Sequence, residues 1–318
     1  MSLDHTPNSD IANLPNSGKD VQEGVEPLTA HQQIAQLNDY FEDNYPEVFT
    51  ALTQDEGAPY RDAGMAVPAE LVESTERQWA RAVDLISHSS LLVLGAGLDH
   101  RMPHNAFISA GQVSADAQPS FATDLPEGVS ATAIRPANPD GSVAISLHGG
   151  PGWFGDGESH DLFWLPLFAS VAAQSGTTIV DLTYPLPGYG AWDATQAAVA
   201  GAWDVVRQAF PGEKVGVVAF GSGLIAAAQV LEQADFLLAM TPRIPEGFQV
   251  DLTGVPTLVT VADSDSRGTS AKVCRQWAEK SGASLTYQEW PSEHIIAAPS
   301  VWRERVTAAG QWLKDLLG

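Results

Sequence analysis

Short runs of apolar residues alternate with segments of helical periodicity along the last two thirds of the chain. The runs are rich in β-branched residues, and several are apolar throughout, as expected for strands that are buried on both faces of a parallel sheet. Strands that alternate with helices predict an α/β fold with a doubly wound, mostly parallel sheet. The predicted strands lie at 106–108, 129–134, 143–147, 178–182, 215–220, 236–240, 257–261 and 285–289. The predicted helices of this part lie at 193–210, 272–280 and 301–317.

The first third of the chain has a different pattern and divides into two parts. Residues 1–27 are rich in Asn, Ser, Asp, Gly and Pro and contain few large apolar side chains, a composition typical of a disordered acidic leader. Residues 28–104 contain two helical segments, which we expect to form a cap packed on a main domain at 105–318. An ordinary helical extension without a role in binding fits the same pattern equally well.

Two helices and one loop are predicted within this cap. Thr29 is placed to cap a first helix with one apolar face. A second helix is predicted from Pro68, which suits a helix start, to Ser87. Residues 91–97 resemble a strand that runs into a dinucleotide-binding loop, but His100 replaces the third glycine of GxGxxG, so we predict a plain loop and no cofactor there. The apolar face of the first helix consists of Ile34, Leu37, Tyr40 and Phe41.

Three residues near the end of the predicted cap are of metal-ligating types. They are Asp99, His100 and His104. Pro103 lies between the two histidines and argues against their sharing one helix face, because proline interrupts a helix. We therefore predict no metal site.

Composition narrows the classes of function. Acidic residues outnumber basic ones 39 to 16, and the net charge of −23 repels phosphate backbones and anionic lipids, so we expect neither nucleic acid nor a membrane surface as a partner. Cys274 is the only cysteine and lies in a predicted helix, which favours a packed thiol. The sequence shows neither a cleavable signal pattern nor an apolar run of membrane-spanning length, so we expect a cytoplasmic location.

A glycine-rich corner follows the apolar run at 215–220 and precedes a segment of small residues, which we predict to be a helix. This order matches a nucleophile elbow, with the pattern small-x-nucleophile-x-small. The flanking residues must be small because the tight turn brings the strand and helix backbones together. Ala219 and Gly223 fill these positions and place Gly221 at the nucleophile position. A motif centred on Ser222 would have two flanking residues that are too large.

A second glycine-rich segment, HGGPGW at 148–153, follows another predicted buried strand. Glycines at a strand end let backbone N–H groups face a developing oxyanion, and each such donor contributes about 3 to 4 kcal/mol to catalysis. We predict an oxyanion-binding loop formed by Gly149 and Gly150 together with the N–H of Ser222, with a plain glycine turn as the alternative. Pro151 has no N–H to donate.

Ordered segments of residues 105–318 resemble the α/β-hydrolases, most closely the carboxylesterases of the hormone-sensitive-lipase-like group. In this resemblance Gly221 stands where the group has its serine, Asp265 falls on the acid position and His294 on the base position. Pro151 replaces the group's third glycine, and HGGPG is also similar to the oxyanion motif of proline iminopeptidases. The resemblance implies the α/β-hydrolase fold and a pocket for an acyl or ester-like small molecule. The segments are 148–161 (HGGPGWFGDGESHD), 184–187, 219–223, 256–265 and 290–294.

The nucleophile position, Asp265 and His294 occur in the chain order of an α/β-hydrolase triad. The acid would hold the imidazole in the right tautomer, and the base would take the proton of the attacking group. Asp263 is the alternative acid. Gly221 has no side chain that can attack a carbonyl, and loss of the nucleophile in a serine hydrolase lowers turnover by on the order of a millionfold.

Two functions remain open, and we favour the first. One is a binding or regulatory protein on an esterase framework, which holds an acyl or ester-like molecule without efficient turnover. The other is an active carboxylic ester hydrolase that uses Ser222 or a water activated by His294. One step along a helix turns a side chain by about 100°, so we expect Ser222 to point away from the nucleophile direction. A scaffold for a protein partner is a third interpretation, based only on the acidic surface and the leader.

Overall fold

The computed structural model of the protein describes residues 28–95, 98–107, 111–188 and 190–318. In this part of the chain eight strands form one sheet, in the order β1-β2-β4-β3-β5-β6-β7-β8. β2 is antiparallel to β1 and β4, and all other neighbouring strands are parallel, which confirms the predicted doubly wound sheet. The strands are β1 (Val113–Asp116), β2 (Ser130–Pro136), β3 (Val143–Leu147), β4 (Thr178–Thr183), β5 (Val215–Phe220), β6 (Leu237–Met240), β7 (Pro256–Ala262) and β8 (Ser284–Trp290).

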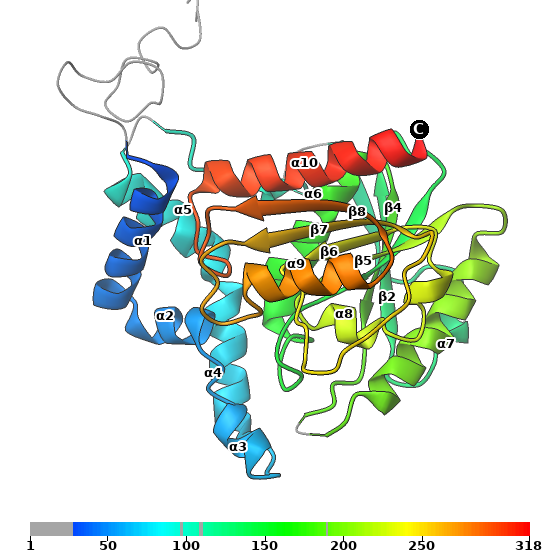
Figure 1. The fold of residues 1–318 in the computed structure, drawn as a ribbon, viewed down its shortest axis with the longest axis horizontal. Helices are drawn as coiled ribbons and strands as arrows, with labels where there is room; N and C mark the ends of the chain where they lie inside the picture. Colours follow the sequence, from blue (N-terminus) through cyan, green and yellow to red (C-terminus); the bar gives the residue numbers. More distant parts are fainter. Residues whose placement is uncertain (1–27, 96–97, 108–110, 189) are drawn as a thin grey trace, which may run out of the picture.

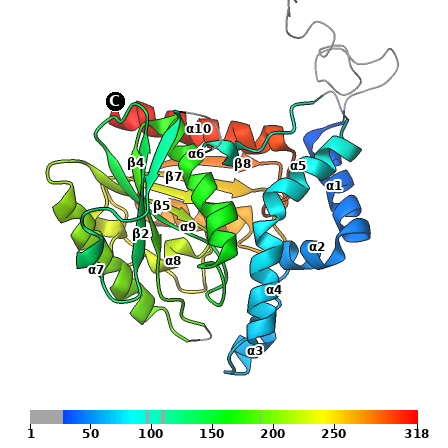
Figure 2. The same cartoon turned by 180° about the vertical axis from the view of Figure 1, so that it is seen from behind.

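Helices cover both faces of this sheet (Figures 1 and 2). α6 (Leu165–Ser175) and α10 (Pro299–Leu317) pack against each other and against one face. α7 (Asp193–Ala209), α8 (Gly223–Ala226) and α9 (Ala271–Lys280) cover the other face. The central strands β3 and β5 supply side chains to both cores, which is why their sequences are apolar throughout.

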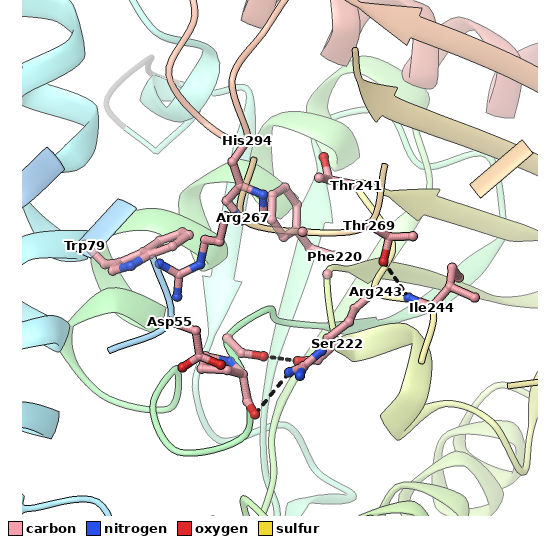
Figure 3. A pocket seen from close by; sticks show the side chains of 14 residues that line it. Asp55, Trp79, Phe220, Ser222, Thr241, Arg243, Ile244, Arg267, Thr269 and His294 are labelled. Atoms are coloured by element: carbon pink, nitrogen blue, oxygen red, sulfur yellow. Dashed lines mark hydrogen bonds between the residues drawn. The ribbon is translucent and has the colours of Figure 1, made fainter. Parts of the chain in front are cut away.

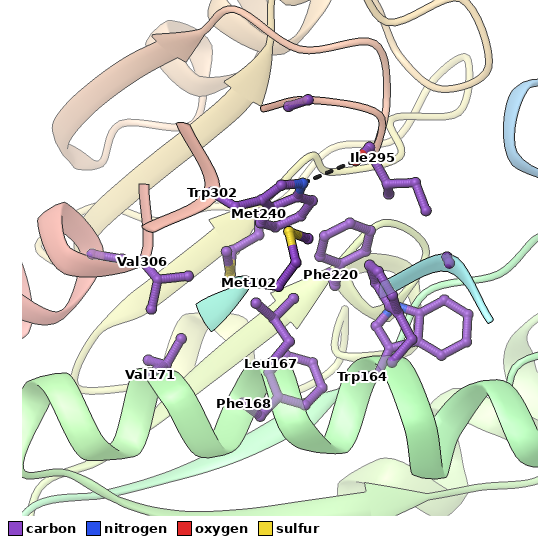
Figure 4. Close-up of a cluster of buried hydrophobic side chains, with 14 of the residues drawn as sticks. Met102, Trp164, Leu167, Phe168, Val171, Phe220, Met240, Ile295, Trp302 and Val306 are labelled. Atoms are coloured by element: carbon purple, nitrogen blue, oxygen red, sulfur yellow. Dashed lines mark hydrogen bonds between the residues drawn. The ribbon is translucent and has the colours of Figure 1, made fainter. Parts of the chain in front are cut away.

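Large side chains fill the core between the sheet and the helices α6 and α10 (Figure 4). Trp164 and Trp302 are fully buried there, and Met240 of β6 lies beside Trp302. The indole N–H of Trp302 donates a hydrogen bond to the carbonyl oxygen of Ile295, at 2.9 Å. This contact ties α10 to the segment that follows β8 and so fixes the chain next to His294.

In the described part of the chain, five α-helices precede β1. Thr29 caps the first of them, as predicted: its hydroxyl accepts from the N–H of Gln32, whose side chain accepts from the N–H of Thr29. Apolar side chains of these helices, including Leu37, Phe41 and Trp79, belong to the same core as α6 and α10. The N-terminal helices are α1 (Ala30–Asn44), α2 (Pro46–Thr53), α3 (Ala58–Asp62), α4 (Ala69–Ala80) and α5 (Ala82–Val93).

The prediction of a strand within residues 91–97 is wrong, because residues 91–93 form the last turn of α5. The helical spacing continues through this segment: Ile86 and Leu94 are buried, whereas Leu92 is 55% exposed. An apolar run of this length does not by itself distinguish a strand from the end of a buried helix. Residues 96–97 of the loop, and the predicted leader 1–27, lie outside the described residues.

The sheet also begins later than predicted. Ala106 and Phe107 follow a short 3-10 helix at Pro103–Asn105 and belong to no strand, so the strand expected there is wrong. Ile108 lies outside the described residues, and the first strand begins at Val113. Proline starts the 3-10 turn because its fixed φ suits a first helical position.

The helix expected over 68–87 is two helices, which meet at Arg81. The small-residue segment after Gly221 is helical only in α8, which is shorter than expected. Cys274 is buried in α9, as predicted for a packed thiol. Among the described residues, no helix is both long enough and apolar enough to cross a membrane.

Candidate active site

β5 ends in a tight corner at Gly221, where φ is +53°. This is the left-handed region that the strained strand-to-helix turn of a nucleophile elbow requires. A Cβ on Gly221 would meet only the Cα of Gly149, at 3.4 Å, which is an ordinary van der Waals contact. A Cβ on Gly223 would instead lie 2.3 Å from the carbonyl oxygen of Leu147. The flanking position must therefore be glycine, whereas the corner itself has room for a side chain.

Ser222 lies one residue beyond the corner, at the N-cap of α8, and is 2% exposed. Its hydroxyl donates a hydrogen bond to the carbonyl oxygen of Gly150 (Figure 3). Among the described residues no hydrogen bond joins Ser222 to His294. The hydroxyl of Ser222 is thus directed into the neighbouring backbone.

Asp265 and His294 follow β7 and β8, and the adjacent carboxyl ends of these parallel strands bring their side chains together. His294 Nδ1 is 2.9 Å from Asp265 Oδ2. The other oxygen of this buried carboxylate accepts hydrogen bonds from the N–H groups of Arg267 and Gly268, at 3.0 and 2.6 Å. Burial alone would raise the pKa of Asp265, but His294 and these hydrogen bonds outweigh it and lower the pKa. Asp265 is therefore ionised at neutral pH and orients the imidazole.

The alternative acid, Asp263, lies against a different histidine. Its carboxylate is 2.9 Å from His31 Nε2, on α1, so the structure brings Asp265 rather than Asp263 to His294. The ring of His294 is flanked edge-on by Trp79 and Phe220, with ring centroids 6.0 and 6.2 Å away. These two aromatic rings fix the imidazole at the edge of the corner.

The glycine loop, residues 148–155, presents backbone N–H groups beside the corner. Within the described part of the chain, no hydrogen bond uses the N–H of Gly149, Gly150 or Ser222. Gly150 has φ +101°, and a Cβ there would lie 2.3 Å from the carbonyl oxygen of Phe154, so this conformation requires glycine. The loop therefore has, beside Gly221, backbone N–H groups without an acceptor among the described residues.

A cavity of about 300 Å³ opens at the corner (Figure 3). Gly221, Ser222 and His294 line it from the sheet side. The N-terminal helices contribute Trp79 of α4 and, from the segment between α2 and α3, Asp55. The wall thus combines two parts of the chain that are far apart in sequence.

Most of this wall was missed by the sequence analysis, including Trp79 and three charged residues. Trp79 had a signal only as one apolar residue of an amphipathic helix, which is more often a core residue. Asp55, Arg243 and Arg267 lie in loops without a motif, where a charged residue is usually solvated. Their position in the cavity depends on long-range packing, which periodicity along the chain does not report.

Glu76 of α4 is a buried carboxylate that ties the N-terminal helices to the glycine loop. Its two oxygens accept hydrogen bonds from the backbone N–H groups of Gly155 and Ser159, at 2.6 and 2.8 Å. The carboxylate therefore holds the end of the loop in place. Its role was not predictable from the sequence, because a glutamate on a helix usually lies on the solvated face.

We expect Glu76→Gln to lower the free energy of unfolding by about 1 to 3 kcal/mol, because its amide nitrogen would face one of the two N–H groups and leave it without an acceptor. Urea-induced unfolding followed by tryptophan fluorescence measures this change. Glu73→Gln, on the exposed side of the same helix, is the matched control and should change stability by less than about 0.5 kcal/mol. Equal stabilities of the two variants would show that Glu76 does not hold the loop.

A second polar cluster is buried behind the glycine loop. His160 Nε2 is 2.7 Å from Asp181 Oδ2, and Ser146 donates a hydrogen bond to the other oxygen of Asp181, at 2.5 Å. The ring of His148 stacks on Tyr184 with centroids 4.4 Å apart, and the Tyr184 hydroxyl donates to the carbonyl oxygen of His148, at 2.9 Å. Burial lowers the pKa of His148 to about 3, so it is neutral. The cluster supports the base of the loop.

Asp99, His100 and His104 do not converge on one point. Asp99 pairs with Arg101, at 2.8 Å, and the hydrogen bonds of this pair hold the pKa of Asp99 far below its usual range. His100 Nε2 contacts the carbonyl oxygen of Gly95, at 2.6 Å, and His104 is buried. Among the described residues, no group of three or more His, Cys, Asp or Glu is placed to hold a metal ion.

Comparisons with known proteins give no match to a protein-family model and none to a curated protein sequence. Solved structures do match. An esterase from the bacterial hormone-sensitive lipase family is 14% identical with a TM-score of 0.57, over 86% of this chain and 99% of that one. A hyperthermophilic esterase from the archaeon Pyrobaculum calidifontis is 14% identical with a TM-score of 0.60, over 92% and 100%. A bacterial heroin esterase is 16% identical with a TM-score of 0.55, over 85% and 99%.

These likenesses establish the α/β-hydrolase fold of this chain, together with its eight-stranded sheet and covering helices. They extend over nearly the whole length of the solved proteins. At such low sequence identity these likenesses show the fold alone, and the chemistry at Gly221 depends on the residues around it.

Proposed function

We propose that this chain is an α/β-hydrolase-fold protein of esterase lineage that binds an acyl or ester-like small molecule, with ordinary serine-hydrolase turnover lost or impaired. One observation carries the proposal: the corner that faces the His294–Asp265 pair is Gly221, which has no hydroxyl or thiol. The neighbouring solved proteins are named as esterases, and their names suggest the ligand class. In a serine hydrolase, the nucleophile accounts for on the order of a millionfold in turnover.

The remaining parts of the site support binding of a carbonyl compound. The N–H groups of Gly149 and Gly150 are unused donors beside a cavity of about 300 Å³, which lies at the small end of the range for ligand pockets. Trp79 closes this cavity from α4. We therefore infer that residues 28–104 act as a helical cap on a hydrolase core at 105–318.

A second candidate function is an active carboxylic ester hydrolase. The intact Asp265–His294 pair favours it, because a histidine oriented by a carboxylate is the arrangement that proton transfer from an attacking group requires. The attacking group would be Ser222 or a water held where the side chain of Gly221 is missing. The hydrogen bond from Ser222 to Gly150 argues against the serine, because the hydroxyl would have to turn away from this carbonyl oxygen before it could attack.

The test compares the natural chain with Ser222→Ala and Gly221→Ser, using short-chain nitrophenyl esters and a fluorophosphonate probe. We expect the natural chain to remain unlabelled with turnover near background, and Gly221→Ser to be labelled. Labelling of the natural chain that disappears in Ser222→Ala would overturn the proposal in favour of a Ser222 esterase. Turnover without labelling that is lost in His294→Gln would establish the water mechanism.

A further inference from the structure

Two arginines in the cavity have no carboxylate partner. Arg243 and Arg267 both line the cavity, and neither forms an ion pair within the described part of the chain. The one acid of the cavity wall, Asp55, is already engaged: one oxygen is 2.7 Å from Arg61, and the other accepts from the indole N–H of Trp153, at 2.9 Å. In a chain with a net charge of −23, the wall of this cavity carries two arginines against one aspartate.

Arg267 is held firmly but keeps part of its guanidinium unused. One nitrogen donates to the carbonyl oxygens of Ala51 and Gln54, the latter at 2.5 Å. The guanidinium lies 5.2 Å from the ring centroid of Trp79 and 5.8 Å from that of Phe154. Its Nη2 atom is buried and has no hydrogen-bond partner among the described residues. A buried donor of this kind is costly unless something accepts from it.

Arg243 approaches the same space from the segment after β6. Within the described chain, the one hydrogen bond of its side chain goes to the carbonyl oxygen of Pro151, at 3.2 Å, which leaves most of the guanidinium donors unused. Burial and the neighbouring positive charge of Arg61 lower the pKa of Arg243. Burial lowers the pKa of Arg267 to about 10, against the opposing charges of Asp55 and Asp265 and with a smaller contribution from Arg243. Both remain charged at neutral pH, and their repulsion would be relieved by an anion between them.

We propose that the cavity binds a short acyl compound with a carboxylate at its far end, such as a dicarboxylic acid or its half-ester. The carboxylate accepts from the guanidinium of Arg243, whose planar fork matches its two oxygens, and from Nη2 of Arg267, since Nη1 of Arg267 already donates to two carbonyl oxygens. The acyl carbonyl lies at the N–H groups of Gly149 and Gly150. For the acyl end of the ligand this assignment rests on the proposed function. The arginines add specificity for a carboxylate at the opposite end of the ligand.

The test is isothermal titration calorimetry of the natural chain with monomethyl succinate, dimethyl succinate and inorganic phosphate. We expect the half-ester to bind at least about tenfold more tightly than the neutral diester. Arg243→Gln should weaken half-ester binding by about ten- to hundredfold and leave diester binding unchanged. Arg243→Lys keeps the charge without the fork and should give an intermediate loss. Arg275→Gln, whose partner Glu289 lies outside the cavity wall, is the matched control and should bind like the natural chain.

The outcomes separate this inference from the proposed function. Equal binding of half-ester and diester, insensitive to Arg243→Gln, would overturn the role of the arginines and leave the acyl-binding proposal standing. Binding of neither compound would overturn both. Phosphate that binds as tightly as the half-ester and loses affinity in Arg243→Gln would show a site for inorganic anions and overturn the acyl carboxylate. Because Arg267 also anchors backbone carbonyls, Arg267→Lys serves as the second variant, after circular dichroism confirms its fold.

Discussion

Gly221→Ser is expected to hydrolyse short-chain nitrophenyl esters with a kcat/KM at least about a thousandfold above that of the natural chain. Loss of a serine nucleophile costs about a millionfold in kcat, and oxyanion stabilisation and binding alone keep about 10³ to 10⁴ over water. The substitution should recover part of this difference, because the remaining groups of the site are in place. Initial rates of nitrophenolate release, measured over a range of ester concentrations, give the value.

The backbone at the corner supports this expectation. A Cβ on Gly221 would meet only the Cα of Gly149, at 3.4 Å, so the new Cβ causes no clash. At φ +53° an L-residue costs about 1 to 2 kcal/mol relative to glycine, which a native fold tolerates. The strain is of the kind that nucleophile elbows carry, and it exposes the side chain toward the cavity.

Two control variants isolate the hydroxyl. Gly221→Ala has the same backbone cost and nearly the same volume, so it should lose stability like Gly221→Ser and stay inactive. His294→Gln in the Gly221→Ser background should abolish both hydrolysis and fluorophosphonate labelling, because the serine would lack its base. A folded Gly221→Ser that is neither active nor labelled would show that the corner is not a nucleophile position.

The buried strands were predictable because burial on both faces requires apolar side chains at every position, which gives a continuous apolar run in the sequence. β3 was predicted with its observed bounds, and β4, β5 and β7 within one residue at each end. β1 was missed because it is a short edge strand, VSAD, whose side chains are exposed or half-buried and therefore carry no apolar signal. The end of α5 was mistaken for a strand for the opposite reason, since its apolar run has no polar residue to mark the helical period.

Residues of the candidate site were predictable from the sequence only where they belong to a local motif. The corner and the glycine loop have a local pattern, because close backbone approach demands glycine there. Spacing alone does not separate Asp263 from Asp265, since both lie in the loop after β7, and the resemblance favoured Asp265. In the structure Asp265 contacts His294, whereas Asp263 contacts His31 of α1. The position of Arg243 in the cavity was not predictable from the sequence, because its neighbours come from distant segments of the chain.

The ion pair between His160 and Asp181 gives the protein a stability that depends on pH. Burial would lower the pKa of His160, but the charges and hydrogen bonds of Asp181 and Asp161 outweigh it and raise the pKa to about 10, against 6.5 for the free side chain. Below pH 6.5 His160 is protonated in the folded and the unfolded chain, so the stabilisation is fully present. Between pH 6.5 and 10 the unfolded chain releases the proton first, and stability falls with a slope of up to about 1.4 kcal/mol per pH unit.

Asp181→Asn is accordingly expected to lower the free energy of unfolding at pH 7 by about 3 to 5 kcal/mol, because it leaves a buried histidine without its counter-charge. Urea-induced unfolding from pH 6 to pH 9 should also show a flatter dependence on pH than in the natural chain. Asp161→Asn removes the other carboxylate beside His160, but its side chain is 73% exposed, so its effect should stay below about 1 kcal/mol. Because both carboxylates contact His160 but only Asp181 is buried, the two variants separate the effect of burial from the effect of contact. Equal losses in the free energy of unfolding would show that contact with His160, and not burial of the pair, determines the stabilisation. The base of the glycine loop would then not depend on Asp181.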